Sequence, residues 1–142
     1  MEGLITVRTR ARVGGESEQI ELQTDAVWTK EADAVRLCYT ETPDEGEPTA
    51  VTVTARMGEV TVERKGELSA VMVFADGEAR ECSYHTPFGD LYLNIRPRRT
   101  QVSFGETGGT VRLWYDLENA AGERSQHEVE MAVRRTAGEG RA

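Results

Sequence analysis

The side chains of this 142-residue chain that could support catalysis gather around His85. Ser83 lies just before it and Asp90 just after it, which are the residue types of a nucleophile, a base and an orienting acid. On a strand, this serine and histidine share the face opposite Cys82 and Tyr84, which we expect to be the solvated face. We therefore interpret His85 as a surface residue and predict no catalytic site.

Metal and phosphate motifs are also missing from the sequence. Cys82 and His85 are three residues apart and would point to opposite faces of a strand, so they cannot share an ion without a bulge. The acidic residues 42–49 lack the alternating spacing and closing glutamate of a calcium loop. No glycine-rich motif precedes a helix that could bind phosphate. We predict neither a metal site nor a cofactor.

Arginines and aromatic residues suggest binding instead. Two arginine clusters stand out, comprising Arg8, Arg10, Arg12, Arg96, Arg98 and Arg99. Either could receive an anionic ligand or an acidic partner, although we favour cross-strand pairing with the plentiful carboxylates. Tyr92 and Trp114 fall on the face opposite the core residues of their strands, where exposed aromatics can mark an interface. A neighbouring segment covering both rings is the alternative.

The elements that must position these residues are short strands. Apolar residues alternate with polar ones along almost the whole chain, which is typical of strands with one buried face. The predicted inward sets include Ile5, Val7, Ala11, Val13, Ile20, Leu22, Ala26, Trp28, Val35, Leu37, Tyr39, Leu91, Leu93 and Ile95. Turn signals such as Gly14-Gly15, Asp76-Gly77 and the Pro87 turn separate them. About ten strands joined by hairpins predict an all-β, antiparallel up-and-down barrel, because closure removes exposed edges.

Length and charge limit the possible functions. The chain is long enough for one domain, which we assign to residues 1–135, with a flexible tail over residues 136–142. A net charge of −8 argues against nucleic acid and anionic membranes as partners. The sequence shows neither a signal peptide nor an apolar run long enough to span a bilayer. We expect a cytoplasmic protein in which Cys38 and Cys82 are free and buried.

The motif around Pro87 carries a family resemblance. Residues 66–74 (GELSAVMVF) and 84–91 (YHTPFGDL) resemble the YwiB family of bacterial proteins, and residues 108–117 (GGTVRLWYDL) are similar too. The likeness covers nearly the whole chain. It implies a calycin-like β-barrel, the fold class of lipocalins and avidins, with function unknown. It implies no catalytic residue, because none is established for the family.

These observations favour a binding protein over an enzyme. We predict that the barrel mouth or lumen holds a small apolar or amphipathic ligand. The residues assigned to this site are Trp28, Tyr39, Tyr84, Phe88, Arg96 and Arg98. The alternative is an interaction module that uses Tyr92, Trp114 and the arginines against a protein partner or a second copy. Whether the lumen is hollow stays open, although filled interiors are commoner in small barrels.

Overall fold

The structure is a computed structural model that describes residues 1–42, 46–66 and 68–136. These residues form ten β-strands and no helix, as the alternating pattern predicts. None of them therefore forms a helix long and apolar enough to cross a membrane. The strands are β1 (Glu2–Val13), β2 (Glu16–Lys30), β3 (Val35–Glu41), β4 (Thr49–Arg56), β5 (Glu59–Gly66), β6 (Ala70–Ala75), β7 (Arg80–Thr86), β8 (Gly89–Gly105), β9 (Gly108–Asn119) and β10 (Arg124–Arg135).

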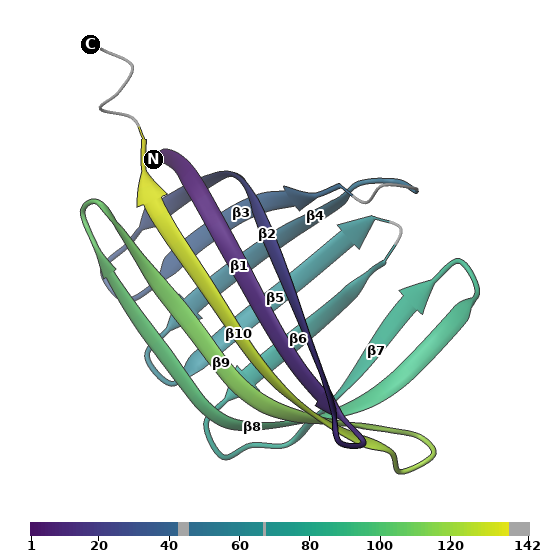
Figure 1. Cartoon of the computed structure of the whole chain (residues 1–142). Coiled ribbons are helices and arrows are strands. Elements are labelled where there is room, and N and C mark those ends of the chain that lie inside the picture. Colours follow the sequence, from purple (N-terminus) through teal and green to yellow (C-terminus); the bar gives the residue numbers. More distant parts are fainter. Residues whose placement is uncertain (43–45, 67, 137–142) are drawn as a thin grey trace.

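All ten strands belong to one antiparallel sheet that curls into a nearly closed barrel (Figure 1). Their order is β6-β5-β4-β3-β2-β1-β10-β9-β8-β7, so consecutive strands pair with each other except β6 and β7, and β1 pairs with β10. The β1–β10 ladder runs from Gly3↔Arg135 to Val13↔Ser125. The predicted up-and-down barrel is therefore confirmed, and the first and last strands close it.

The incomplete part of the barrel is the seam between β6 and β7. Among the described residues, the backbone hydrogen bonds across this seam are those between His85 of β7 and Ser69 just before β6, where each amide donates to the other residue's carbonyl. Further along, the Cys82 thiol donates to the carbonyl of Val71 instead of a ladder bond. The predicted Asp76-Gly77 turn is present, with Gly77 at φ 77°, but the strands that it joins do not pair along their length.

The barrel interior is filled by the apolar sides of the strands. Gly3 lets the sheet approach the Trp28 ring, since a Cβ at position 3 would lie 2.6 Å from Cζ3 of that tryptophan. The ten largest side chains below 2% exposure are Trp28, Phe74, Ile5, Leu37, Ile95, Leu113, Val51, Val53, Val60 and Val111. Burial of these side chains at about 1.5–3 kcal/mol each is the main force that holds the sheet closed.

Some predictions about burial are wrong. Val13, Ile20 and Leu91 were expected in the core, yet each is more than half exposed. They face inward on strand segments that extend beyond the packed body, where the described residues leave them uncovered. Both cysteines are free, but Cys38 is exposed because it alternates with the buried residues of β3. The last strand ends at Arg135, and residues 137–142 of the predicted tail lie outside the described residues.

Candidate binding site at the barrel mouth

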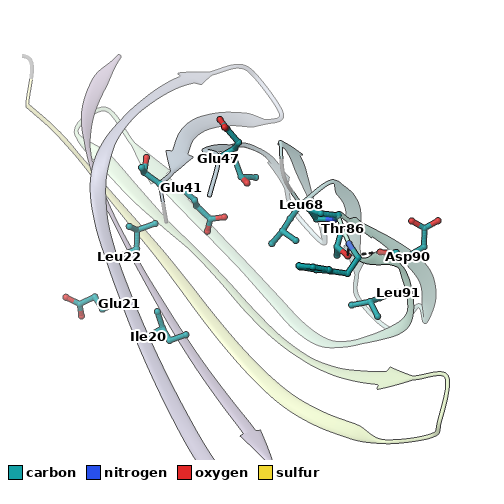
Figure 2. A pocket seen from close by; sticks show the side chains of 14 residues that line it. Ile20, Glu21, Leu22, Glu41, Glu47, Leu68, Thr86, Asp90 and Leu91 are labelled. Atoms are coloured by element: carbon teal, nitrogen blue, oxygen red, sulfur yellow. Dashed lines mark hydrogen bonds between the residues drawn. The ribbon is translucent and has the colours of Figure 1, made fainter. Parts of the chain in front are cut away.

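An open pocket of about 970 Å³ lies at one end of the barrel (Figure 2). Its walls come from β2, the β3–β4 connection, Leu68 before β6, and the β7–β8 hairpin. The lining residues are Ile20, Glu21, Leu22, Glu41, Thr42, Glu47, Thr49, Leu68, Thr86, Pro87, Phe88, Gly89, Asp90 and Leu91. Figure 2 shows Ile20 and Leu22 on β2, with Leu68 and Leu91 on the other side of the opening. We call this pocket the mouth.

The rim of the mouth exposes large apolar side chains. Phe88 is 99% exposed, Ile20 58%, Leu91 57% and Leu68 41%. Scattered exposed apolar residues are ordinary on a protein surface, but these four line one concavity. Covering such a group of side chains with an apolar ligand lowers the free energy, because it removes apolar surface from water.

The β7–β8 hairpin holds Phe88 at its tip. The Thr86 hydroxyl accepts a hydrogen bond from the Phe88 amide at 3.1 Å and donates to the Gly89 carbonyl at 2.7 Å. Gly89 has φ 127°, which glycine adopts without the cost that a side chain would bring. Pro87 and Phe88 form the predicted two-residue turn between the paired strands. The turn therefore fixes the backbone, and the phenyl ring projects into solvent.

Inward-facing polar residues lie next to the mouth inside the barrel. Arg64 follows Val60 and Val62 on the inner face of β5, and its guanidinium donates a hydrogen bond to the Glu41 carboxylate. Burial lowers the pKa of Arg64, but Glu41 and two tyrosines outweigh this effect and raise the pKa overall. The Arg64 guanidinium therefore stays charged, and its partner Glu41 also lines the mouth.

Three tyrosines surround this ion pair. Burial raises the pKa of Tyr39 to about 12, Glu41 adds to the rise and Arg64 opposes it. Burial is also the largest cause of the raised pKa of Tyr84 and Tyr115. All three hydroxyls therefore stay protonated at neutral pH. Among the described residues, the Tyr39 hydroxyl and Arg64 Nε are buried without a hydrogen-bond partner, and the Tyr84 hydroxyl donates to the Met72 sulfur at 3.1 Å.

The second histidine completes the polar interior. The His127 ring stacks on Tyr115 with centroids 5.1 Å apart, and its Nε2 lies 2.7 Å from the Ser125 hydroxyl. Burial lowers the pKa of His127, and Asp116 opposes that shift, so the ring is neutral at neutral pH. The interior beside the mouth thus contains one ion pair and several neutral hydrogen-bonding groups, which suits recognition of a polar group more than binding of an ion.

Of the residues considered for catalysis, the structure brings two together. His85 Nδ1 and Asp90 Oδ1 are 2.9 Å apart on paired strands, and both side chains are about half exposed. Ser83 lies opposite Tyr92 in the same ladder. Within the described ranges, no group of three or more His, Cys, Asp or Glu residues could hold a metal ion.

The predicted ligand-binding residues occupy different places. Phe88 lies on the rim, whereas Tyr39 and Tyr84 belong to the polar interior next to it. Trp28 is 1% exposed and fills the core, so it does not line the mouth. Arg96 is exposed on β8 away from the mouth, and Arg98 Nε lies 3.4 Å from Asp116 Oδ1.

The arginines and the predicted interface aromatics do not form one surface. Arg8 bonds to Glu21 at 2.8 Å and lies 3.4 Å from Glu130, so cross-strand pairing explains this arginine, as favoured. Arg99 lies over the half-buried Trp114 ring, 5.4 Å from its centroid. Tyr92 is 64% exposed. It precedes Leu93, which pairs with Asn119 at the end of β9, whereas Trp114 pairs with Arg99.

Sequence reasoning missed Arg64, Glu41 and His127. The signal was present in the alternation, because Arg64 continues the inward set Val60 and Val62, and Glu41 continues that of β3. A charged residue that continues the inward set of a strand, close to the strand end, is expected to point into the mouth of a barrel. The missing information was that these two side chains meet, because β4 separates β3 from β5 in the sheet.

Comparison with known proteins gives a family and a fold. A family model described as "Domain of unknown function (DUF1934)" matches residues 5–131. The crystal structure of the YwiB protein from Bacillus subtilis has a TM-score of 0.86 and 24% identity, covering 95% of this chain and 92% of that one. A Bacteroides ovatus structure of unknown function has a TM-score of 0.37 and 17% identity over 96% of this chain and 42% of that one, which is too low to support an argument. No curated protein matches.

Proposed function

Because the chain belongs to the DUF1934 family of unknown function, we propose its role from the geometry alone: it binds an amphipathic ligand in the mouth. The observation that carries the proposal is the pocket of about 970 Å³ with four exposed apolar side chains on its rim. Binding pockets for small molecules have about 300–1,000 Å³ and combine apolar walls with a few polar groups.

The polar interior supports an amphipathic ligand over a purely apolar one. The buried Tyr39 hydroxyl and Arg64 Nε are donors without an acceptor among the described residues. A buried donor without a partner costs about 1–3 kcal/mol, which a ligand oxygen would recover. We propose that the apolar part of the ligand contacts Phe88 and Leu91 while an acceptor group points from the mouth toward the Arg64 and Tyr39 donors.

The packed interior restricts the predicted ligand site to the mouth. The core side chains leave the lumen filled, so the ligand does not enter the barrel body. The calycin-like assignment stays a prediction, and the proposal does not depend on it. We also propose a cytoplasmic location, supported by two free cysteines.

Titration with Nile red, an uncharged dye that brightens in apolar surroundings, tests this proposal. The double variant Phe88→Ser, Leu91→Ser should bind the dye about tenfold more weakly, because it removes about 1.4 kcal/mol or more of apolar contact. Met57→Ser is the matched control, since Met57 is 93% exposed at the β4–β5 turn and does not line the mouth. Equal dye affinity in all three proteins would contradict binding at the mouth.

A further inference from the structure

We propose that the ligand of the mouth is an extended, positively charged polypeptide segment that adds as a strand to the free edge of β2. This inference rests on the proposed function, because it assigns a chemical class to the ligand of the same pocket. Three observations carry it: an unpaired strand edge, a pocket lined by the same strand segment, and an excess of carboxylates along that segment.

The unpaired edge belongs to the first part of β2. The β1–β2 ladder covers this strand from Glu16 to Val27, whereas β3 pairs with it only from Ala26 to Lys30. Among the described residues, positions 16–25 therefore have a partner strand on one side only. Ten strand residues span about 34 Å, which is longer than a typical strand of five to six residues. Unpaired amides and carbonyls on an edge of this kind are the usual template for strand addition.

The mouth borders the same part of β2. Its lining includes Ile20, Glu21 and Leu22 in succession, although successive side chains point to opposite faces of a strand. Ile20 and Leu22 lie on the side of the opening and the Glu21 side chain points away from it (Figure 2), so the mouth meets the inner face and the backbone of this part of β2. An added strand would lie about 4.8 Å from β2 and would place its inward side chains between Leu22 and the hairpin residue Phe88. The pocket thus offers room for both the backbone and the apolar side chains of a segment.

Charge decides what kind of segment fits. Residues 16–25 contain Glu16, Glu18, Glu21 and Asp25 and no lysine or arginine. The lining of the mouth likewise contains four acidic residues and, in the part of the chain that the structure describes, no lysine or arginine. Arg8, Arg64 and His85, which lie outside the lining, contact three of these carboxylates. Arg8 pairs with Glu21 but also lies near Glu130, so it neutralises this edge only in part. A segment that alternates apolar and basic residues complements both the pocket and the edge.

The same charges disfavour a second copy of this chain. Antiparallel pairing of two β2 edges would place four carboxylates of one copy beside four of the other. Like charges on directly opposed strand residues are destabilising. We therefore commit to a different, cationic polypeptide as the partner.

The test uses fluorescent octapeptides that alternate leucine with lysine, or leucine with glutamate, and the full-length protein. At low salt the lysine peptide should bind at least about tenfold more tightly, and binding should weaken as salt is added. Glu18→Lys should weaken lysine-peptide binding severalfold. Glu31→Lys, an exposed substitution in the β2–β3 turn, is the matched control and should leave it unchanged.

Backbone methylation separates strand addition from mere attraction of charges. Two versions of the lysine peptide would carry N-methyl groups at alternate residues, in opposite phases. A strand bonded to β2 on one side should lose binding in one phase and keep it in the other. In the unmethylated complex, hydrogen exchange of amides within residues 17–25 should slow.

The outcomes distinguish this inference from the proposed function. Equal binding of both peptides, tolerance of methylation in both phases, or no protection of β2 would overturn strand addition. Nile red binding that still depends on Phe88 and Leu91 would then leave the proposed function standing. A concentration-dependent dimer that protects β2 without any peptide would also overturn the inference, because the occupant would be a second copy.

Discussion

The body of the barrel and its mouth follow the same alternation of residues but differ in what lies opposite. On β2, Trp28 and Ile20 face the same way, yet the first is 1% exposed and the second 58%. On β8, Ile95 and Leu91 differ in the same manner, at 0% and 57%. In each pair one side chain meets the opposite wall of the barrel and the other meets the open mouth. The difference shows that an inward phase makes a core only where the sheet closes around it.

The two ends of the barrel also differ. The opposite end has a pocket of about 600 Å³ lined by residues such as Ala34, Met57 and Phe104. The exposed apolar residues of the rim and the half-buried Glu41–Arg64 pair lie at the mouth. The mouth thus combines apolar exposure with unsatisfied buried donors, two features that a folded protein tolerates at the expense of stability.

The largest expected effect comes from comparing a position of β2 in the barrel body with one at the mouth. Trp28→Ala should lower the free energy of unfolding by about 3–5 kcal/mol, because it leaves a cavity in the core. Ile20→Ala should change it by about 0.5 kcal/mol or less, since this side chain is mostly solvated already. Urea unfolding of both variants measures the difference. A large loss at Ile20 would mean that the mouth is covered in solution.

The second largest effect is expected from alkaline pH, which should lower the free energy of unfolding through the buried Tyr39. The pKa of Tyr39 is raised from 10.0 to about 12, so the folded protein keeps a proton that the unfolded chain releases. This contribution, about 2–3 kcal/mol, is present below pH 10 and is lost as the pH rises toward 12. Unfolding free energies measured across this range should fall less steeply in Tyr39→Phe than in the unsubstituted protein. Tyr92→Phe, at an exposed position, is the control and should behave as the unsubstituted protein does.

The ion pair should give a smaller effect. Glu41→Gln leaves the Arg64 guanidinium partly buried with a weaker acceptor and should cost about 1–2 kcal/mol, below the value for a fully buried pair. The double variant Glu41→Gln, Arg64→Met should recover part of this loss in a double-mutant cycle measured by urea unfolding. Additive effects of the two substitutions would show that the pair does not stabilise the mouth.

The smallest change in stability is expected on the rim. Leu91→Ser should alter the free energy of unfolding by about 0.5 kcal/mol or less while it weakens Nile red binding severalfold. The parallel substitution Leu113→Ser, in the core, should instead unfold the protein in thermal melts. Similar losses of stability from both would contradict the division between a packed body and an open mouth.

Strand identity and pairing could be predicted because they depend on local chemistry. Alternation gives each residue a face, and turn residues such as Gly77 and Gly89 supply the conformations that join strands. The ten antiparallel strands and the near-closed barrel follow from these patterns. Of the residues predicted to bind a ligand, Phe88 lies on the rim of the mouth and Trp28 in the core. Alternation does not separate such places, because a buried position and a lining position have the same phase.

What the sequence alone determined is therefore the set of strands, their order and the inward face of each. What only the tertiary structure decided is where the barrel ends, and hence that Ile20, Leu68 and Leu91 border a mouth while Glu41 and Arg64 meet beside it. The physical reason is that residue phase is set within a strand, whereas coverage depends on a wall supplied by residues far away in the chain. The free edge of β2 also depends on coverage. Most of Glu16–Val27 pairs with β1 alone, because β3 is too short to reach it.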